Sequence, residues 1–140
     1  KRSIKETARR ERYKFFMESA QKHNTSAVAI GHTADDNTET ILHRILRGTG
    51  TLGLGGIPIK RPLVSGSAIQ LIRPLLFTWR KEIIEYLREK QFTYRTDASN
   101  YEPIYLRNKI RLELIPLLEN QYNPNIKNLL IQLCQILNSI

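Results

Sequence analysis

The stretch Ala27-Val-Ala-Ile-Gly-His-Thr-Ala-Asp-Asp-Asn-Thr-Glu39 decides the fold class, because a short apolar run passes through a glycine directly into an acidic helix start. Ala27–Ile30 has the composition of a buried parallel strand. The helix that follows is predicted from about Asp36 to Arg47, with Asp35 or Asp36 as its cap. In open α/β sheets, ligands bind at such strand-to-helix loops. The stretch therefore predicts an α/β sheet with a ligand site at this loop.

Periodicity and turn residues predict the other elements. They are a capped helix from Ser3 to about Asn24, a strand within 69–76 that holds Pro74, a helix over 79–90 capped by Thr78, a short strand at 92–94, a basic helix over 105–118 interrupted at Pro116, and an apolar helical stripe over 126–140. Alternation of helices and strands predicts an α/β protein with a mainly parallel sheet, followed by C-terminal helices.

Composition restricts the function classes. The 140 residues carry a net charge of +9, which favours a polyanionic partner such as nucleic acid. The one cysteine, Cys134, lies in an apolar run and is expected to be buried; it excludes an internal disulfide or a cysteine-rich metal site and favours a reducing compartment. No apolar run is long enough for a membrane span. Because the chain opens at Lys1 without methionine, we expect a segment of a longer protein.

An acidic pair follows the glycine turn. At about 100° per residue, Asp36, Glu39, His43 and Arg47 share one face of the predicted helix, and apolar residues fill the other. We therefore expect both carboxylates to point away from the core. They can serve as helix caps, and they can also bind an ammonium group or a magnesium ion; the two interpretations are compatible. His32, just before the pair, is either a loop histidine or part of the site.

Two other features suit phosphate contacts. The basic residues Arg107, Lys109 and Arg111 begin a predicted helix, and the arginines within residues 9–12 form a similar group. A solvated helical face is the alternative for both groups.

The glycine-rich segment 48–57 is not a P-loop, because it follows a helix and lacks Gly-Lys-Ser/Thr. We interpret it as a mobile loop whose amides can meet phosphate, or as a plain connection.

Several stretches together resemble the tRNA(Ile)-lysidine synthetases of the PP-loop, or N-type ATP pyrophosphatase, superfamily. The likeness covers roughly residues 3 to 125, and the glycine turn with its acidic pair is shared more widely in the superfamily than the later stretches. The stretches that carry it are the Arg9–Phe16 helix, Ala29–Glu39, Leu46–Gly50, Gly53–Pro58, Ile72–Leu76, Arg80–Glu82, Asp97–Asn100 and Tyr105–Arg111.

The resemblance implies a Rossmann-like adenine nucleotide alpha hydrolase fold and a two-step reaction that uses ATP with Mg²⁺. ATP adenylates the C2 oxygen of cytidine 34 in tRNA(Ile) with a CAU anticodon, and free L-lysine then displaces AMP to give lysidine, which changes decoding from AUG to AUA. The residues implied are Asp36, Glu39 and His32 for lysine, Arg12 with Asp36 and Glu39 for catalysis, and Arg107, Asn108, Arg111 and Arg47 for tRNA. No metal held by protein side chains is implied.

One departure from the superfamily pattern is the absence of its Ser-Gly-Gly-x-Asp-Ser phosphate loop. We expect it upstream of Lys1, so that the segment by itself would be inactive. Residues 1–122 would be the C-terminal portion of the synthetase domain, and residues 123–140 a helix that leaves it or starts a second domain. The resemblance is compatible with a homodimer, with a bacterial cytoplasmic location, or with the chloroplast stroma for a plastid-encoded protein.

Two alternatives stay open. Another PP-loop tRNA-modifying enzyme, such as a thiolase, would share the glycine turn, but thiolases acting on cytidine rely on CxxC pairs that this sequence lacks. A non-catalytic RNA-binding module would explain the positive charge equally well. It would leave the acidic pair at the predicted ligand edge without a role.

Overall fold

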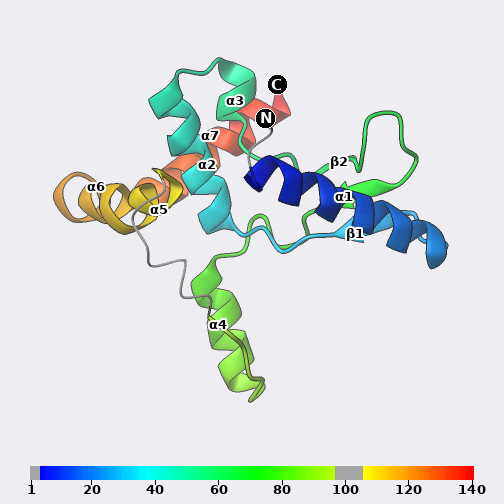
Figure 1. The fold of residues 1–140 in the computed structure, drawn as a ribbon. Coiled ribbons are helices and arrows are strands. Elements are labelled where there is room, and N and C mark those ends of the chain that lie inside the picture. The colour runs from blue at the N-terminus through cyan, green and yellow to red at the C-terminus, as the bar shows by residue number, and fades with distance from the viewer. Residues whose placement is uncertain (1–3, 97–105) are drawn as a thin grey trace. The chain divides into compact units, whose positions relative to one another are not determined.

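The elements that position the site come from a computed structural model, which describes residues 4–96 and 106–140 (Figure 1). The chain divides into two units. Unit 1 comprises Lys1–Gly31 and Pro58–Pro74, and unit 2 comprises His32–Ile57 and Leu75–Ile140. Each unit buries its own apolar side chains.

Unit 1 begins with helix α1 (Ile4–Lys22). The helix ends where Asn24 takes a positive φ of 50°, and the amide of Thr25 then donates to the carbonyl of Ala20 at 2.9 Å. Asparagine tolerates this left-handed conformation better than most residues, which is why it can end a helix. The predicted helix end is therefore confirmed, whereas the predicted cap at Ser3 lies outside the described residues.

A three-stranded sheet forms the rest of unit 1, in the order β1, β3, β2. Strand β1 (Ala27–Ala29) pairs in parallel with β3 (Gln70–Ile72), and β2 (Lys60–Pro62) pairs antiparallel with the other side of β3. The central strand carries the fully buried Leu71, and Leu63 is buried beside the sheet. The α/β class is confirmed.

The sheet differs from the prediction in two respects. It is mixed rather than mainly parallel, because β2 runs antiparallel; Lys60-Arg-Pro62 has no apolar alternation from which a strand could be predicted. Strand β1 was expected to be buried, yet Ala27 and Ala29 are exposed. The reason is that β1 lies at the edge of the sheet, with β3 as its neighbour among the described strands.

Unit 2 is built around α2 (Ala34–Arg47) and α7 (Ile126–Ser139), which pack against each other. The apolar stripe predicted for the last helix therefore meets a partner within this unit. Cys134 is fully buried, as expected. The buried residues of this core are Ile41, Leu42, Ile110, Ile115, Leu130 and Cys134.

The helix predicted over 105–118 is observed as three consecutive segments. They are α5 (Leu106–Lys109), a π-helical turn (Ile110–Leu114) and α6 (Ile115–Gln121). Ile115 N–H donates to Ile110 O, five residues earlier. Proline cannot donate to the carbonyl four residues before it and its ring crowds that carbonyl, so Pro116 favours a wider turn at this point. The predicted interruption is thus present, but it lies before the proline.

The glycine-rich segment is more ordered than predicted. It contains a helical turn, α3 (Thr51–Leu54), and its second half is buried. The guanidinium of Arg44 donates to the carbonyls of Gly53 and Gly56 at 2.9 and 2.7 Å, and Asn37 Oδ1 accepts from the amide of Ile57 at 2.8 Å. These anchors come from α2, the helix that directly precedes the segment, and fix the segment against that helix.

Replacing Gly56 with alanine is expected to destabilise unit 2 by about 2 kcal/mol, because the backbone is left-handed there and the added methyl would overlap a buried side chain. The residue has φ +70°, and a Cβ would run into Asn37 Oδ1 and lie 3.1 Å from Cys134 Sγ. The midpoint of urea unfolding measures the effect. Gly48→Ala is a control for backbone strain alone, since it also has a positive φ but nothing lies near its Cβ. Equal losses in the two variants would show that crowding contributes nothing.

Helix α4 (Arg80–Glu89) is joined to the rest of unit 2 by Asp35. Its Oδ2 accepts a hydrogen bond of 2.7 Å from the backbone N–H of Arg80, and its Oδ1 lies 3.7 Å from Lys127 Nζ on α7. A carboxylate at this position satisfies an unpaired amide at the helix start. Trp79, rather than the predicted Thr78, is the N-cap. No strand forms at 92–94, where a short one was predicted.

Candidate functional site

The acidic pair lies in the first two turns of α2, but the cap is not the residue predicted from sequence. Thr33 is the N-cap, and its Oγ1 accepts from the amide of Asp36 at 3.4 Å. In return, Asp36 Oδ2 accepts hydrogen bonds from Thr33 N at 2.8 Å and from Thr33 Oγ1 at 3.1 Å. This reciprocal arrangement is a capping box with aspartate in the third position, and it fixes the Asp36 carboxylate at the helix N-terminus.

Glu39 is buried, with 1% of its surface exposed. Arg111 donates two hydrogen bonds to its carboxylate, from Nε to Oε1 at 2.6 Å and from Nη2 to Oε2 at 3.0 Å. Arg107 adds a third, from Nε to Oε2 at 3.1 Å. Two-pronged contacts of this kind are the strongest form of arginine–carboxylate pairing. We call Asp36, Glu39, Arg107 and Arg111 the acid–arginine cluster.

The expectation that both carboxylates point away from the core was wrong for Glu39. A helix projection places it on a polar face, but α5 and the π-helical turn cover that face with two arginines. A carboxylate can be buried when its charge is paired and its lone pairs accept hydrogen bonds. The local sequence of α2 does not contain this information, because the partners come from the distant 106–111 segment.

Asp36 keeps one oxygen turned toward this cluster. Its Oδ1 lies 3.9 Å from Arg107 Nη2 and 4.0 Å from Arg111 Nη2, which is within ion-pair range but beyond hydrogen-bonding distance. About a quarter of its side chain is exposed. The hydrogen bond to Glu39 is the main reason that the pKa of Arg111 lies above its usual value. Two carboxylates and two guanidiniums thus balance in charge, with Asp36 Oδ1 as the carboxylate oxygen available to a ligand's donor.

Comparison with known proteins adds to this geometry. A family model described as "PP-loop domain" matches residues 1–118 of the sequence, a span that includes the whole cluster. The chain belongs to the PP-loop family.

Three relatives of this PP-loop chain carry the name tRNA(Ile)-lysidine synthase. The protein of Clostridium perfringens is 45% identical over 124 residues, which are 89% of this chain and 25% of the relative. The protein of Geobacillus kaustophilus is 46% identical over 121 residues, 86% of this chain and 25% of the relative. The protein of a Nostoc species is 40% identical over 131 residues, 94% of this chain and 38% of the relative. The PP-loop chain thus spans about a quarter to two fifths of the length of these relatives.

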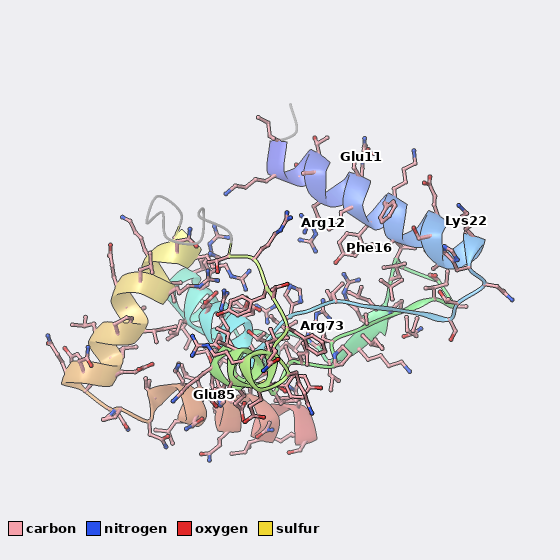
Figure 2. The ribbon with its side chains drawn as sticks, turned by 90° about the horizontal axis from the view of Figure 1, so that it is seen from below. Glu11, Arg12, Phe16, Lys22, Arg73 and Glu85 are labelled. Carbon is pink, nitrogen blue, oxygen red and sulfur yellow. The ribbon has the colours of Figure 1, made fainter. Side chains whose placement is uncertain are left out.

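The other residues singled out from sequence have different surroundings in the PP-loop domain. Arg12 belongs to unit 1, where it is exposed on α1, on the same face as Phe16 and opposite Glu11 (Figure 2). Arg47 is exposed in the last turn of α2. His32 and Asn108 are half-buried in unit 2. The structure therefore brings Asp36, Glu39, Arg107 and Arg111 together within unit 2, while Arg12 lies in the other unit.

His43 is half-buried on α2, one turn beyond Glu39. Burial lowers its pKa, and the positive charges of Arg47, Arg107 and Arg44 lower it further. The imidazole is therefore neutral at physiological pH. A neutral His43 adds no positive charge to the face of α2 that holds Asp36 and Glu39.

Two polar side chains that complete the cluster, those of Thr40 and Thr33, were not predicted from the sequence. Thr40 Oγ1 accepts from Arg107 Nη2 at 3.2 Å, and the same nitrogen lies 3.2 Å from the carbonyl oxygen of Asp36. Thr33 holds Asp36 from the other side. The signal available in the sequence was the hydroxyl residue three positions before Asp36, the spacing of a capping box. Nothing local indicated Thr40.

Over residues 4–96 and 106–140, no helix combines the length and the apolarity that crossing a membrane requires. Over the same ranges, no group of three or more histidine, cysteine, aspartate or glutamate side chains is placed to bind a metal ion. The acid–arginine cluster contains two carboxylates, and its remaining members are cations.

Proposed function

We propose that this domain, as part of a longer protein, acts in the ATP-dependent ligation of free L-lysine to C2 of cytidine 34 in tRNA(Ile) with a CAU anticodon. The observation that carries the proposal is the 45% identity to a tRNA(Ile)-lysidine synthase over 124 residues. An alignment of that length must include the acid–arginine cluster. The product is lysidine, which changes decoding from AUG to AUA.

The chemistry has two steps. ATP supplies the AMP group that activates the C2 oxygen of cytidine 34, with pyrophosphate as the leaving group. The amino group of lysine then attacks C2 and AMP departs. The 140 residues contain no Ser-Gly-Gly-x-Asp-Ser phosphate loop, so we assign none of them to the ATP phosphates. A requirement for Mg²⁺ remains a prediction that accompanies ATP.

Within this reaction we assign lysine binding to Asp36, with Glu39 in support. An ammonium group needs a carboxylate oxygen that can still accept hydrogen bonds, and Asp36 Oδ1 meets that need. Glu39 already accepts three hydrogen bonds, so its role is to hold Arg107 and Arg111 in place. His32 is proposed to border the lysine.

The cations are assigned to the tRNA and to the charge that develops during activation. Arg107 and Arg111 are fixed by Glu39, which fits them to meet a phosphate or the activated nucleotide. Asn108 and Arg47 are proposed as further tRNA contacts, and Arg12 as the arginine that stabilises charge as the adenylate forms. A homodimer and a plastid location remain predictions; since the relatives come from bacteria, we propose the cytoplasm.

The test is a lysine-incorporation assay with the full-length protein, ATP, Mg²⁺, labelled lysine and a tRNA(Ile) transcript bearing the CAU anticodon. We expect label in the RNA and release of AMP and pyrophosphate. A transcript with uridine at position 34 should remain unlabelled. Tight tRNA binding without incorporation would support a non-catalytic RNA-binding module instead. In a parallel assay with a sulfur donor in place of lysine, transfer of sulfur to the RNA would identify a thiolase.

A further inference from the structure

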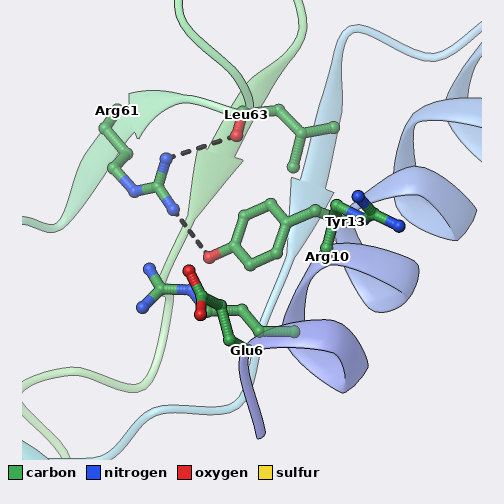
Figure 3. A pocket seen from close by; sticks show the side chains of 6 residues that line it. Glu6, Arg10, Tyr13, Arg61 and Leu63 are labelled. Atoms are coloured by element: carbon green, nitrogen blue, oxygen red, sulfur yellow. Dashed lines mark hydrogen bonds between the residues drawn. The ribbon is translucent and has the colours of Figure 1, made fainter. Parts of the chain in front are cut away.

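A basic pocket lies in unit 1, and none of the residues that line it is assigned a role above. It has a volume of about 410 Å³ and is formed between one face of α1 and the β2 region (Figure 3). We call it the arginine pocket. The residues that line it are Glu6, Arg9, Arg10, Tyr13, Arg61 and Leu63.

Tyr13 organises the guanidinium groups of this pocket. The guanidinium carbon of Arg9 lies 5.6 Å from the centre of its ring, and that of Arg61 lies 5.3 Å from it. Arg61 Nη2 also donates to the tyrosine hydroxyl at 2.6 Å, as Figure 3 shows. Cation–π contacts of this kind hold a guanidinium in place without using its hydrogen-bond donors. Tyr13 thus preorganises two positive charges on one surface.

Several donors in the pocket remain for a ligand. A guanidinium has five N–H groups. Arg61 uses them on Tyr13 and on the carbonyls of Pro62 and Leu63, which leaves its Nε–H and one Nη2–H. Arg9 makes the ring contact with Tyr13 and no hydrogen bond or ion pair with any described residue. An anion in the pocket would therefore find N–H donors already in position.

The local charge is positive. Arg73 is buried in the same unit, and the nearby charge of Arg61 is, after burial itself, a cause of its lowered pKa. Glu6 is the one acidic residue that lines the pocket, against three arginines. Arg10 Nη2 lies 3.6 Å from Glu11 Oε1, but both side chains are more than half exposed, so this ion pair is weak. The pocket keeps an excess of positive charge that favours an anionic ligand.

We propose that the arginine pocket binds the phosphodiester backbone of the tRNA, as a docking surface on unit 1. The inference rests on the proposed function, which makes tRNA the substrate. A backbone contact fits better than base readout, because the pocket offers guanidinium donors and its aromatic ring is already occupied by them. The net charge of +9 fits an RNA partner better than an acidic protein patch, because phosphate repeats along the whole strand.

The test compares Arg9→Gln and Arg10→Gln with Lys22→Gln in the full-length protein. Lys22 is a matched control, because it is exposed on the same helix about 20 Å from Arg9. Its replacement by glutamine removes the same single positive charge. We expect each arginine variant to bind tRNA(Ile) about threefold to tenfold more weakly and to lower the slope of log Kd against log salt by about one. Lys22→Gln should leave the slope unchanged.

Each outcome decides the matter. Arginine variants that bind tRNA like Lys22→Gln overturn the proposal, and if the unmodified protein still incorporates lysine the proposed function survives. Weaker tRNA binding by both arginine variants, together with no lysine incorporation by the unmodified protein, supports the docking surface and overturns the proposed function. A loss of affinity for inorganic phosphate without a loss for tRNA would identify a small-anion site and overturn the RNA assignment.

Discussion

Replacing Asp36 with asparagine in the full-length protein is expected to lower kcat/KM for lysine about tenfold to hundredfold while the domain stays folded. A hydrogen bond to a charged group contributes about 1.5–3 kcal/mol, which corresponds to that range. Asparagine keeps an oxygen that can accept from Thr33 N and Thr33 Oγ1, so the capping box survives. At the proposed ammonium site the negative charge and the Oδ1 acceptor are lost, and a neutral N–H donor takes their place. Steady-state kinetics with varied lysine concentration measure the effect.

The neighbouring carboxylate supplies a matched control. Asp35→Asn removes the same charge one residue away, but Asp35 accepts from the amide of Arg80 and pairs with Lys127. We expect it to leave the KM for lysine near the unmodified value. If Asp36→Asn binds and turns over lysine normally, Asp36 does not hold the substrate. If both variants lose activity equally, the effect comes from general charge rather than from one site.

Replacing Arg111 with methionine is expected to destabilise unit 2 by about 3 kcal/mol, because it leaves a buried carboxylate with one arginine instead of two. Glu39 would lose the 2.6 and 3.0 Å hydrogen bonds and keep only the one from Arg107, whose side chain is about half exposed. Methionine retains an unbranched apolar stem of similar length. The midpoint of urea-induced unfolding measures the loss.

Two comparisons isolate the pairing. Lys109→Met removes a positive charge from an exposed side chain two residues earlier, and we expect a change within about 0.5 kcal/mol. The double variant Glu39→Gln with Arg111→Met should lose less than the sum of the two single variants, because no unpaired buried charge remains. Strict additivity would mean that Glu39 and Arg111 do not stabilise each other.

The parts of the fold that could be predicted are those with a strong local pattern. The end of α1 at Asn24, the strand before Gly31 and the apolar stripe of α7 follow from residue type and spacing alone. Strand β2 could not be predicted, because its Lys-Arg-Pro sequence has neither alternation nor β-branched residues. It forms because β3 offers a free edge, which is a tertiary effect.

The candidate site was predicted in composition but not in arrangement. The sequence places Asp36 and Glu39 one turn apart and marks Arg107 and Arg111 as basic, yet it assigns the first pair to a ligand and the second to tRNA. It cannot show that Glu39 and the arginines meet, because about 70 residues separate them and only packing in unit 2 joins them. Thr33 was passed over as the cap because the neighbouring aspartates are equally good caps.

The π-helical turn Ile110–Leu114 governs how this helix tolerates a change in length. An α-helical residue advances about 100° round the axis, and the wider turn sets every later side chain back by roughly 90°. Ile115 thereby falls in line with Ile110 on the core side, while Arg107 and Arg111 keep to the flank. The π-helical turn thus rotates the residues after it relative to the residues before it, so that arginines and core residues occupy separate faces. Deleting one residue between Arg111 and Ile115 would let the segment continue as a regular α-helix, with Ile110 and Ile115 four residues apart and still on the core side.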